Sequence, residues 1–165
     1  MPLDEQILKK YPNLVFVETG TNYGVATQYA INIGFKKIIS IEIDLELYKY
    51  NIKKYKDIHN VSLYLGNSST MLYNLIKNIS QPITFWLDAH KEIDDNCPLF
   101  LELDQIKLHH IKTHTILIDD RRCFEKELKN ITEQEIITKL FKINRNYKIK
   151  YESSLFKDDI IVATI

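Results

Sequence analysis

The chain has 165 residues, of which 45% are hydrophobic, and its 22 basic residues balance 22 acidic ones. This length can bury one hydrophobic core and is too short for two ordinary domains, so we expect a single domain over residues 1–165. A formal net charge of zero excludes the basic field that nonspecific binding to nucleic acid or membranes uses, and we expect neither partner. No apolar run approaches the roughly 20 residues of a membrane span, and no signal-like segment starts the chain, which predicts a cytoplasmic protein.

Strand-like apolar segments alternate along the chain with segments that carry apolar residues at helical spacing. This alternation is typical of βαβ units around a mostly parallel sheet, and it predicts an α/β fold. Seven strands are predicted, at Leu14–Thr19, Lys37–Ile43, Val61–Leu65, Ile83–Leu87, Thr115–Ile118, Lys148–Glu152 and Ile160–Thr164. Helices are predicted between them, at Val25–Ile33, Leu45–Tyr55, Ser69–Asn78, Leu99–His110 and Thr132–Ile143.

A glycine-containing turn follows the first predicted strand. Residues 17–24 (Val-Glu-Thr-Gly-Thr-Asn-Tyr-Gly) lead into the helix predicted from Val25, so Gly20 and Gly24 would let the backbone approach a ligand at the helix N-terminus. The GxGxxG spacing of a dinucleotide fingerprint is absent, which disfavours a nucleotide-cofactor oxidoreductase. A turn that needs glycine for its geometry alone is the alternative.

Polar residues also end the second and third predicted strands. Glu42 stands where an acid accepts both ribose hydroxyls in nucleotide-binding α/β folds, and Asp44 is expected to cap the following helix. After the third strand, Asn67 and Ser68 form either part of a ligand site or a polar turn in which Ser68 caps a helix.

Acidic residues follow the fourth and fifth predicted strands. Asp88 comes directly after Ile83–Leu87, and Asp119 with Asp120 comes after Thr115–Ile118. Because the carboxyl ends of neighbouring parallel strands line the ligand crevice, these acids could hold one hard cation such as Mg²⁺ against a substrate oxygen. A capping or turn role is the alternative for the Asp119 pair.

Basic side chains lie next to these acids in the sequence. His90 and Lys91 follow Asp88 closely. A lone His or Lys is usually a solvated loop side chain, but the proximity to Asp88 favours a functional role for these two. Arg121 and Arg122 follow Asp120, and they could either pair with it or bind an anionic group of a substrate.

The last two predicted strands break the alternation, because only residues 153–159 separate them. Such a short connection cannot hold a crossover helix, so the final strand should return antiparallel to its predecessor as a hairpin.

The chain resembles the class I S-adenosylmethionine-dependent methyltransferases over nearly its whole length. Within that class it is similar to the cation-dependent O-methyltransferases of the catechol, caffeoyl-coenzyme-A and macrocin types. The resemblance implies a seven-stranded Rossmann-like sheet in the order 3-2-1-4-5-7-6, with the last strand antiparallel. The motifs that carry it are the series Glu18, Gly20, Gly24 and Thr27, the turn Gly66-Asn67-Ser68, the segment Leu87-Asp88-Ala89-His90-Lys91, and the pair Asp119-Asp120.

The resemblance also implies a role for each of these residues toward S-adenosylmethionine and a divalent cation. Glu18 would pair with the ammonium of the cofactor, Glu42 would bind its ribose, and Asn67, in place of the usual Asp, would face adenine. The remaining cofactor-binding residues would be Gly20, Thr21, Asn22, Gly24, Thr27, Ser68 and Asp88. The metal ligands would be Asp88, Asp119 and Asp120.

The function that follows is methyl transfer to a hydroxyl of a sugar, a glycan or another small molecule. A cation on the accepting oxygen would lower the pKa of that oxygen, after which His90 or Lys91 could take the proton. His90 is slightly favoured because an unperturbed histidine changes charge near neutral pH. No helices are expected before Leu14 to cover the substrate, so a homodimer partner or a large substrate would take their place. The alternative function is a noncatalytic binding or regulatory module on the same fold.

Overall fold

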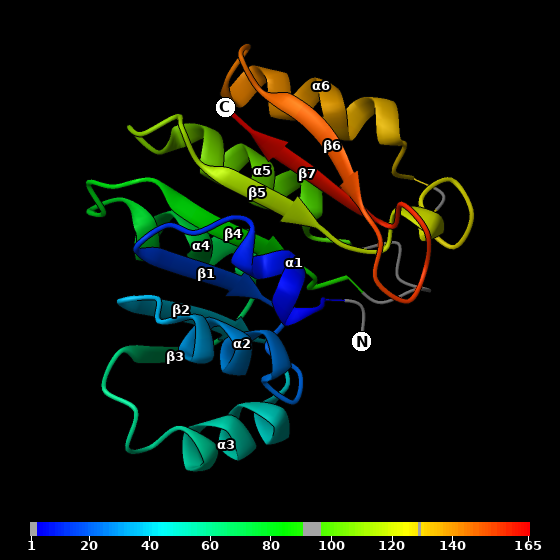
Figure 1. Ribbon diagram of the computed structural model, residues 1–165. Helices are drawn as coiled ribbons and strands as arrows, with labels where there is room; N and C mark the ends of the chain where they lie inside the picture. The colour runs from blue at the N-terminus through cyan, green and yellow to red at the C-terminus, as the bar shows by residue number, and fades with distance from the viewer. Residues whose placement is uncertain (1–2, 91–96, 129) are drawn as a thin grey trace.

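The computed structural model describes residues 3–90, 97–128 and 130–165, and its centre is one seven-stranded sheet in the order β3-β2-β1-β4-β5-β7-β6 (Figure 1). The strands are β1 (Val15–Thr19), β2 (Lys37–Glu42), β3 (Val61–Leu65), β4 (Ile83–Leu87), β5 (Thr115–Ile118), β6 (Lys148–Glu152) and β7 (Ile160–Thr164). The pairs from β3 to β5 are parallel, whereas β7 runs antiparallel to both β5 and β6. The predicted order and the predicted hairpin are confirmed.

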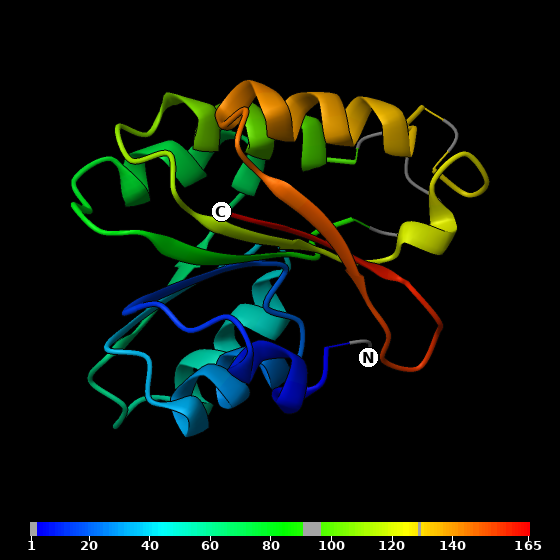
Figure 2. The ribbon, with the colours of Figure 1, turned by 45° about the horizontal axis from the view of Figure 1, so that its top comes forward.

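Helices cover both faces of this sheet (Figure 2). On one face lie α1 (Glu5–Lys9), α2 (Val25–Ile33) and α3 (Leu45–Lys54), and on the other lie α4 (Ser68–Ile76), α5 (Leu99–Leu108) and α6 (Glu133–Ile143). A short 3-10 helix, η1 (Arg121–Cys123), follows β5. Two buried apolar clusters result, a larger one against α4, α5 and α6 and a smaller one against α1 and α2. Within the described ranges, no helix is both long and apolar enough to cross a membrane.

The predicted helix signals are present, with one shift at α4. Asp44 caps α3 by accepting the backbone N–H groups of the next turn, and Thr132 forms a reciprocal capping box at the start of α6. Gly34 ends α2 in the left-handed conformation. The N-cap of α4 is Asn67, whose side chain accepts the N–H of Ser69 at 2.9 Å, and Ser68 is the first helical residue and not the cap.

Helix α1 was missed by the sequence prediction, which expected no helix before Leu14. Asp4 caps it through a 2.8 Å bond from Gln6 N–H, and its Ile7 and Leu8 are buried in the smaller cluster. With five residues, α1 is too short to show a helical period in the sequence, and tertiary packing holds it.

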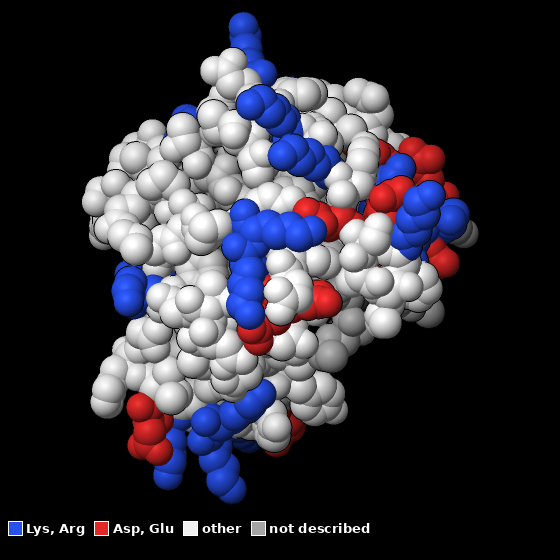
Figure 3. Space-filling view, viewed as in Figure 1, with Lys and Arg blue, Asp and Glu red and all other residues white. Residues whose placement is uncertain are grey.

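Charged side chains of both signs share the face seen in Figure 3, most densely around the loops at its right. This mixture matches the formal net charge of zero.

Candidate functional site

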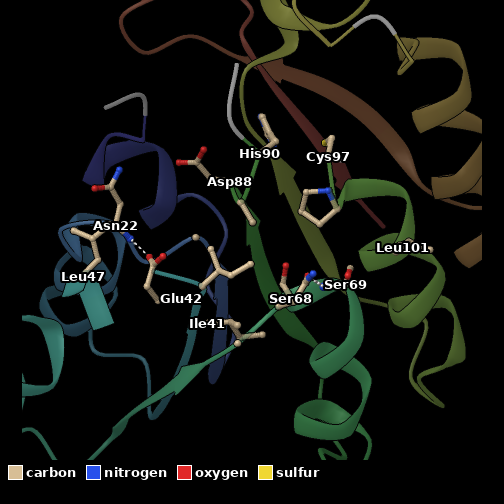
Figure 4. Close-up of a pocket in the computed structure, with 16 residues that line it drawn as sticks. Asn22, Ile41, Glu42, Leu47, Ser68, Ser69, Asp88, His90, Cys97 and Leu101 are labelled. Atoms are coloured by element: carbon tan, nitrogen blue, oxygen red, sulfur yellow. Dashed lines mark hydrogen bonds between the residues drawn. The ribbon is translucent and has the colours of Figure 1, made fainter. Parts of the chain in front are cut away.

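A cavity of about 770 Å³ opens at the carboxyl ends of the parallel strands (Figure 4). Its walls come from the loops after β1, β2, β3 and β4 and from the start of α5, as expected for an open α/β sheet. The residues predicted from the sequence that line it are Gly20, Asn22, Glu42, Asn67, Ser68, Asp88 and His90. Apolar side chains of Ile43, Leu47 and Leu101 complete the lining beside Glu42 and the start of α5.

Glycine is required where the loop after β1 approaches β4. Gly20 has φ +81°, and a Cβ atom at this position would lie 2.3 Å from the carbonyl oxygen of Asp88. Gly24 also has a positive φ, of +74°, and it is the N-cap of α2. The two glycines therefore meet a geometric need, and Gly20 in addition lines the cavity.

Glu42 presents a fixed carboxylate at the cavity wall. Its Oε2 accepts the backbone N–H of Asn22 at 2.7 Å, and its Oε1 accepts that of Asp44 at 2.8 Å. These two bonds orient the carboxylate before any ligand arrives, and the side chain remains in contact with the cavity (Figure 4).

Glu18 lies beneath the loop and not at the cavity surface. Its Oε2 accepts hydrogen bonds from Thr27 Oγ1 at 2.5 Å and Ser40 Oγ at 2.6 Å, and Ser40 bonds in turn to Thr21 Oγ1. Burial raises the pKa of Glu18 to about 7. Of the predicted cofactor residues, Glu18, Thr21, Gly24 and Thr27 are thus placed behind the cavity lining, where they support the loop.

The ends of β4 and β5 bring the predicted acids together, in two overlapping groups that share Asp120. In one group Asp88, His90 and Asp120 each offer a ligand atom, and these atoms lie within 4.8 Å of one another. The other group consists of Asp119, Asp120 and Asp159. The predicted set of three acids is therefore divided, and His90 and Asp159 extend it. Lys91 lies outside the described residues.

The acids crowd one another electrostatically. Burial and then the negative charge of Asp120 raise the pKa of Asp88 well above its ordinary value. Burial and then the charges of Asp88 and Asp120 raise the pKa of Asp119 to about 9, and its Oδ2 has no hydrogen-bond partner among the described residues. Burial also raises the pKa of Asp120, but interactions with His90 and Arg122 outweigh it and lower that pKa. Full ionisation of the cluster would therefore need a positive charge beside it.

Arg122 supplies part of that charge. It bonds to Oδ1 of Asp120 at 2.5 Å and to Oδ2 of Asp159, and its guanidinium lies 4.3 Å from the ring centre of Phe156. Arg121 pairs with Glu133 at 2.7 Å. The sequence left open whether these arginines pair with Asp120 or bind an anionic group of a substrate. In the structure both pair with acids, Arg122 with Asp120 and Arg121 with Glu133.

Glu102 was missed by the sequence prediction. It lies on α5 with 1% of its surface exposed, and its Oε1 makes no hydrogen bond within the described part of the chain. Burial raises its pKa, while interactions with the hydroxyls of Ser68 and Thr19 and with His90 oppose that rise. The sequence did hold a signal of its burial, because Glu102 is an acid on the apolar face of α5 that Leu99, Leu103 and Ile106 form.

The chain has the fold of the class I S-adenosylmethionine-dependent methyltransferases. TomG, an O-methyltransferase from Streptomyces achromogenes in complex with S-adenosylmethionine, superposes with a TM-score of 0.65 at 12% identity, covering 98% of this chain and 77% of TomG. The fibrillarin of Methanococcus jannaschii, a pre-rRNA processing protein, gives a TM-score of 0.62 at 15% identity, covering 98% and 72%.

A third similar structure is the methyltransferase PaMTH1 of Podospora anserina, bound to S-adenosylhomocysteine. It gives a TM-score of 0.58 at 15% identity and covers 91% of this chain and 70% of its own. No family model and no curated protein matches the sequence. At these identities the likeness extends to the fold alone.

Proposed function

We propose that the protein is an S-adenosylmethionine-dependent O-methyltransferase whose site also binds a divalent cation. The observation that carries the proposal is the lining of one cavity. The oriented carboxylate of Glu42 lines this cavity together with Asp88 and His90, which lie at the edge of the acid cluster. A ribose-binding acid and a group able to activate a hydroxyl are thereby neighbours in the same space.

The cofactor half of the proposal is supported by the walls of this cavity. Glu42 would accept the ribose hydroxyls, and Ile43 and Leu101 would offer apolar surface for adenine beside Asn67. Gly20 and Asn22 would face the amino acid end of the cofactor. The presence of S-adenosylmethionine or its product in TomG and PaMTH1 agrees with this assignment.

The cation half is supported by the chemistry of the donor set. Asp120 would hold the ion either with Asp119 and Asp159 or with Asp88 and His90, and hard oxygen donors favour Mg²⁺. The unpartnered Oδ2 of Asp119 and the raised pKa values of Asp88 and Asp119 fit such a site, because a cation would relieve the crowding of like charges. A bound cation would lower the pKa of an accepting hydroxyl and fix its position.

With the ion held by Asp119, Asp120 and Asp159, His90 is the residue that would take the proton. Its side chain is 1% exposed, and its Nε2 lies 3.4 Å from Oδ2 of Asp120 without forming a hydrogen bond in the described residues. In the transfer, the bond between the methyl carbon and sulfur would break as the bond from carbon to the accepting oxygen forms, with S-adenosylhomocysteine as the leaving group, and the imidazole of His90 would take the hydroxyl proton. The acceptor would be a hydroxyl of a sugar or another small molecule, and Lys91 remains a second candidate base.

Titration calorimetry with S-adenosylhomocysteine, with and without Mg²⁺, tests both halves of the proposal. We expect the wild-type protein to bind the ligand and Mg²⁺, and an Asp88→Ala, Asp119→Ala double variant to lose the metal signal. The matched control is Asp104→Ala, because Asp104 is an exposed acid paired with Lys139 away from the cavity. Absence of ligand binding by the wild type under either condition would overturn the enzyme assignment.

A second candidate is a cofactor-binding module without metal or catalysis. The pairing of Arg122 with Asp120 and Asp159 favours it, because this arginine already provides a positive charge for the acids. The same titration separates the candidates, since this module would bind S-adenosylhomocysteine and show no response to Mg²⁺.

A further inference from the structure

Helix α3 bonds to the backbone of the loop that follows β1. Three consecutive carbonyl oxygens of that loop each accept a hydrogen bond from a different side chain in the last turn of α3 or just after it. The bonds run from Asn51 Nδ2 to Asn22 O at 2.6 Å, from Lys54 Nζ to Tyr23 O at 2.9 Å, and from Tyr55 OH to Gly24 O at 2.5 Å. The three donors are spaced so that they share one side of the helix.

These bonds determine which way the loop's peptide groups point. In a trans peptide the carbonyl and the following N–H point in opposite directions, so the N–H groups after the three carbonyls turn away from α3. The N–H of Asn22 itself is held by Glu42 on the cavity wall. The loop is therefore fixed between α3 on one side and Glu42 on the other.

The contact between α3 and the loop leaves no room for adjustment. A Cβ atom on Gly24 would lie 2.4 Å from Oδ1 of Asn51 and 2.8 Å from the hydroxyl of Tyr55. Asn51 is fully buried, and its Oδ1 has no hydrogen-bond partner in the described structure. A buried acceptor without a partner lowers stability, so an amide here contributes through its nitrogen, which donates to Asn22 O in the loop and to Leu47 O in α3.

The loop needs such support because its backbone is unusual. Gly20, Asn22 and Gly24 all have positive φ angles, and glycine in particular has many other conformations open to it. A loop that is ordered before binding loses less conformational entropy when the ligand arrives.

We propose that Asn51, Lys54 and Tyr55 are positioning residues that hold this loop ready for the amino acid end of the cofactor. This inference rests on the proposed cofactor. Of these three residues, none lines the cavity, so they would act on affinity through Asn22, Tyr23 and Gly24.

The test measures the dissociation constant of S-adenosylhomocysteine by calorimetry, together with unfolding by urea. Tyr55→Phe removes the hydroxyl and keeps the ring, and Lys54→Met removes the ammonium and keeps most of the stem. We expect each change to weaken binding about 5- to 20-fold, as loss of preorganisation predicts. Lys54→Arg should restore affinity to within about twofold, because a guanidinium can also donate to the Tyr23 carbonyl.

The matched controls are Tyr50→Phe and Lys53→Met, because both residues are exposed on α3 and neither donates to the loop carbonyls. Tyr50→Phe keeps the ring that lies 5.9 Å from the ring of Tyr23 and removes only the hydroxyl. Equal affinity in wild type, Tyr55→Phe and Lys54→Met would overturn the inference while leaving the proposed function intact. So would failure of Lys54→Arg to restore binding. If the wild type binds no S-adenosylhomocysteine, the proposed function and this inference both fall.

Discussion

The imidazole rings of His109 and His114 are hydrogen-bonded to each other, with Nδ1 of His109 3.0 Å from Nε2 of His114. The backbone N–H of Ile83 donates to Nδ1 of His114, so its Nε2 carries a proton and donates to His109. His109 then donates through Nε2 to the carbonyl of Ile76 at 3.0 Å. This buried chain of hydrogen bonds links α4, α5 and β4, and it requires both rings to be neutral.

Acid should therefore destabilise the protein through this pair. Burial lowers the pKa of both rings, that of His114 to about 3, so the unfolded chain binds protons more readily than the folded one. The stabilisation is complete above pH 6.5 and is lost as the pH falls toward 3. We expect His114 to account for about 3 kcal/mol of lost stability between pH 7 and pH 4. Urea unfolding at both pH values should show this loss reduced in His114→Asn and unchanged in His59→Gln, an exposed control.

Glu18 should have the opposite pH dependence. Its folded pKa of about 7 lies above its ordinary value of 4.5, so its contribution is fully present below pH 4.5 and is lost as the pH rises through 7. Between pH 4.5 and pH 7, Glu18 should cost the wild type of the order of 3 kcal/mol in its free energy of unfolding. This loss should be absent in Glu18→Gln and present in Glu46→Gln, an exposed control. Because the histidines oppose this slope between pH 4.5 and 6.5, the comparison uses the difference between variant and wild type. A flat difference would contradict the buried, protonated state of Glu18.

A pair of glycine substitutions separates steric clash from backbone strain. Gly20→Ala places its methyl 2.3 Å from the carbonyl oxygen of Asp88. At Gly34, with a similar φ of +93°, a methyl would meet no described atom within 4 Å apart from those of its chain neighbours. Gly34→Ala should cost about 1 kcal/mol of stability, from the left-handed conformation alone. Gly20→Ala should cost more than about 2 kcal/mol and weaken binding of S-adenosylhomocysteine. Equal losses in urea unfolding would show that the loop can move away from β4.

Removal of Arg122 should make the protein more responsive to Mg²⁺. Arg122→Met leaves Asp120 and the buried Asp159 without their shared cation, and we expect a loss of about 3 kcal/mol in metal-free buffer. Added Mg²⁺ should recover more stability in the variant than in the wild type. The control is Lys139→Met, which breaks a more exposed pair with Asp104 and should cost less than about 1 kcal/mol. Identical Mg²⁺ responses in Arg122→Met and the wild type would contradict a cation site at Asp120.

The strands and their order were predictable because their signals are local or shared with a large family. The apolar runs from Val61 to Leu65 and from Ile83 to Leu87 reproduce β3 and β4 to the residue. The seven-residue gap before Ile160 was enough to predict the hairpin. Helix boundaries shifted by a residue or two, as at α4, because side-chain caps decide them.

The depth of individual side chains could not be predicted in the same way. Every residue of β1 is buried, so its sequence shows no alternation of polar and apolar residues. Such a pattern could not tell whether Glu18 reaches the cavity surface or lies beneath the loop. Likewise, the pairing of Arg122 with Asp159 depends on the return of the hairpin to the end of β5, and residues 37 positions apart carry no local signal of it. Glu102 was detectable in principle, as an acid in an apolar stripe, but such a residue predicts burial without naming its neighbours.

Strand β7 lies between β5 and β6, both of which precede it in the sequence. Strands β5 and β6 are therefore joined in one sheet only when residues 160–164 pair with both of them. Asp159, which pairs with Arg122, arrives in the same step. The acid cluster is therefore complete only once β7 has paired with β5, and before that step Asp119 and Asp120 lie at an unfinished sheet edge.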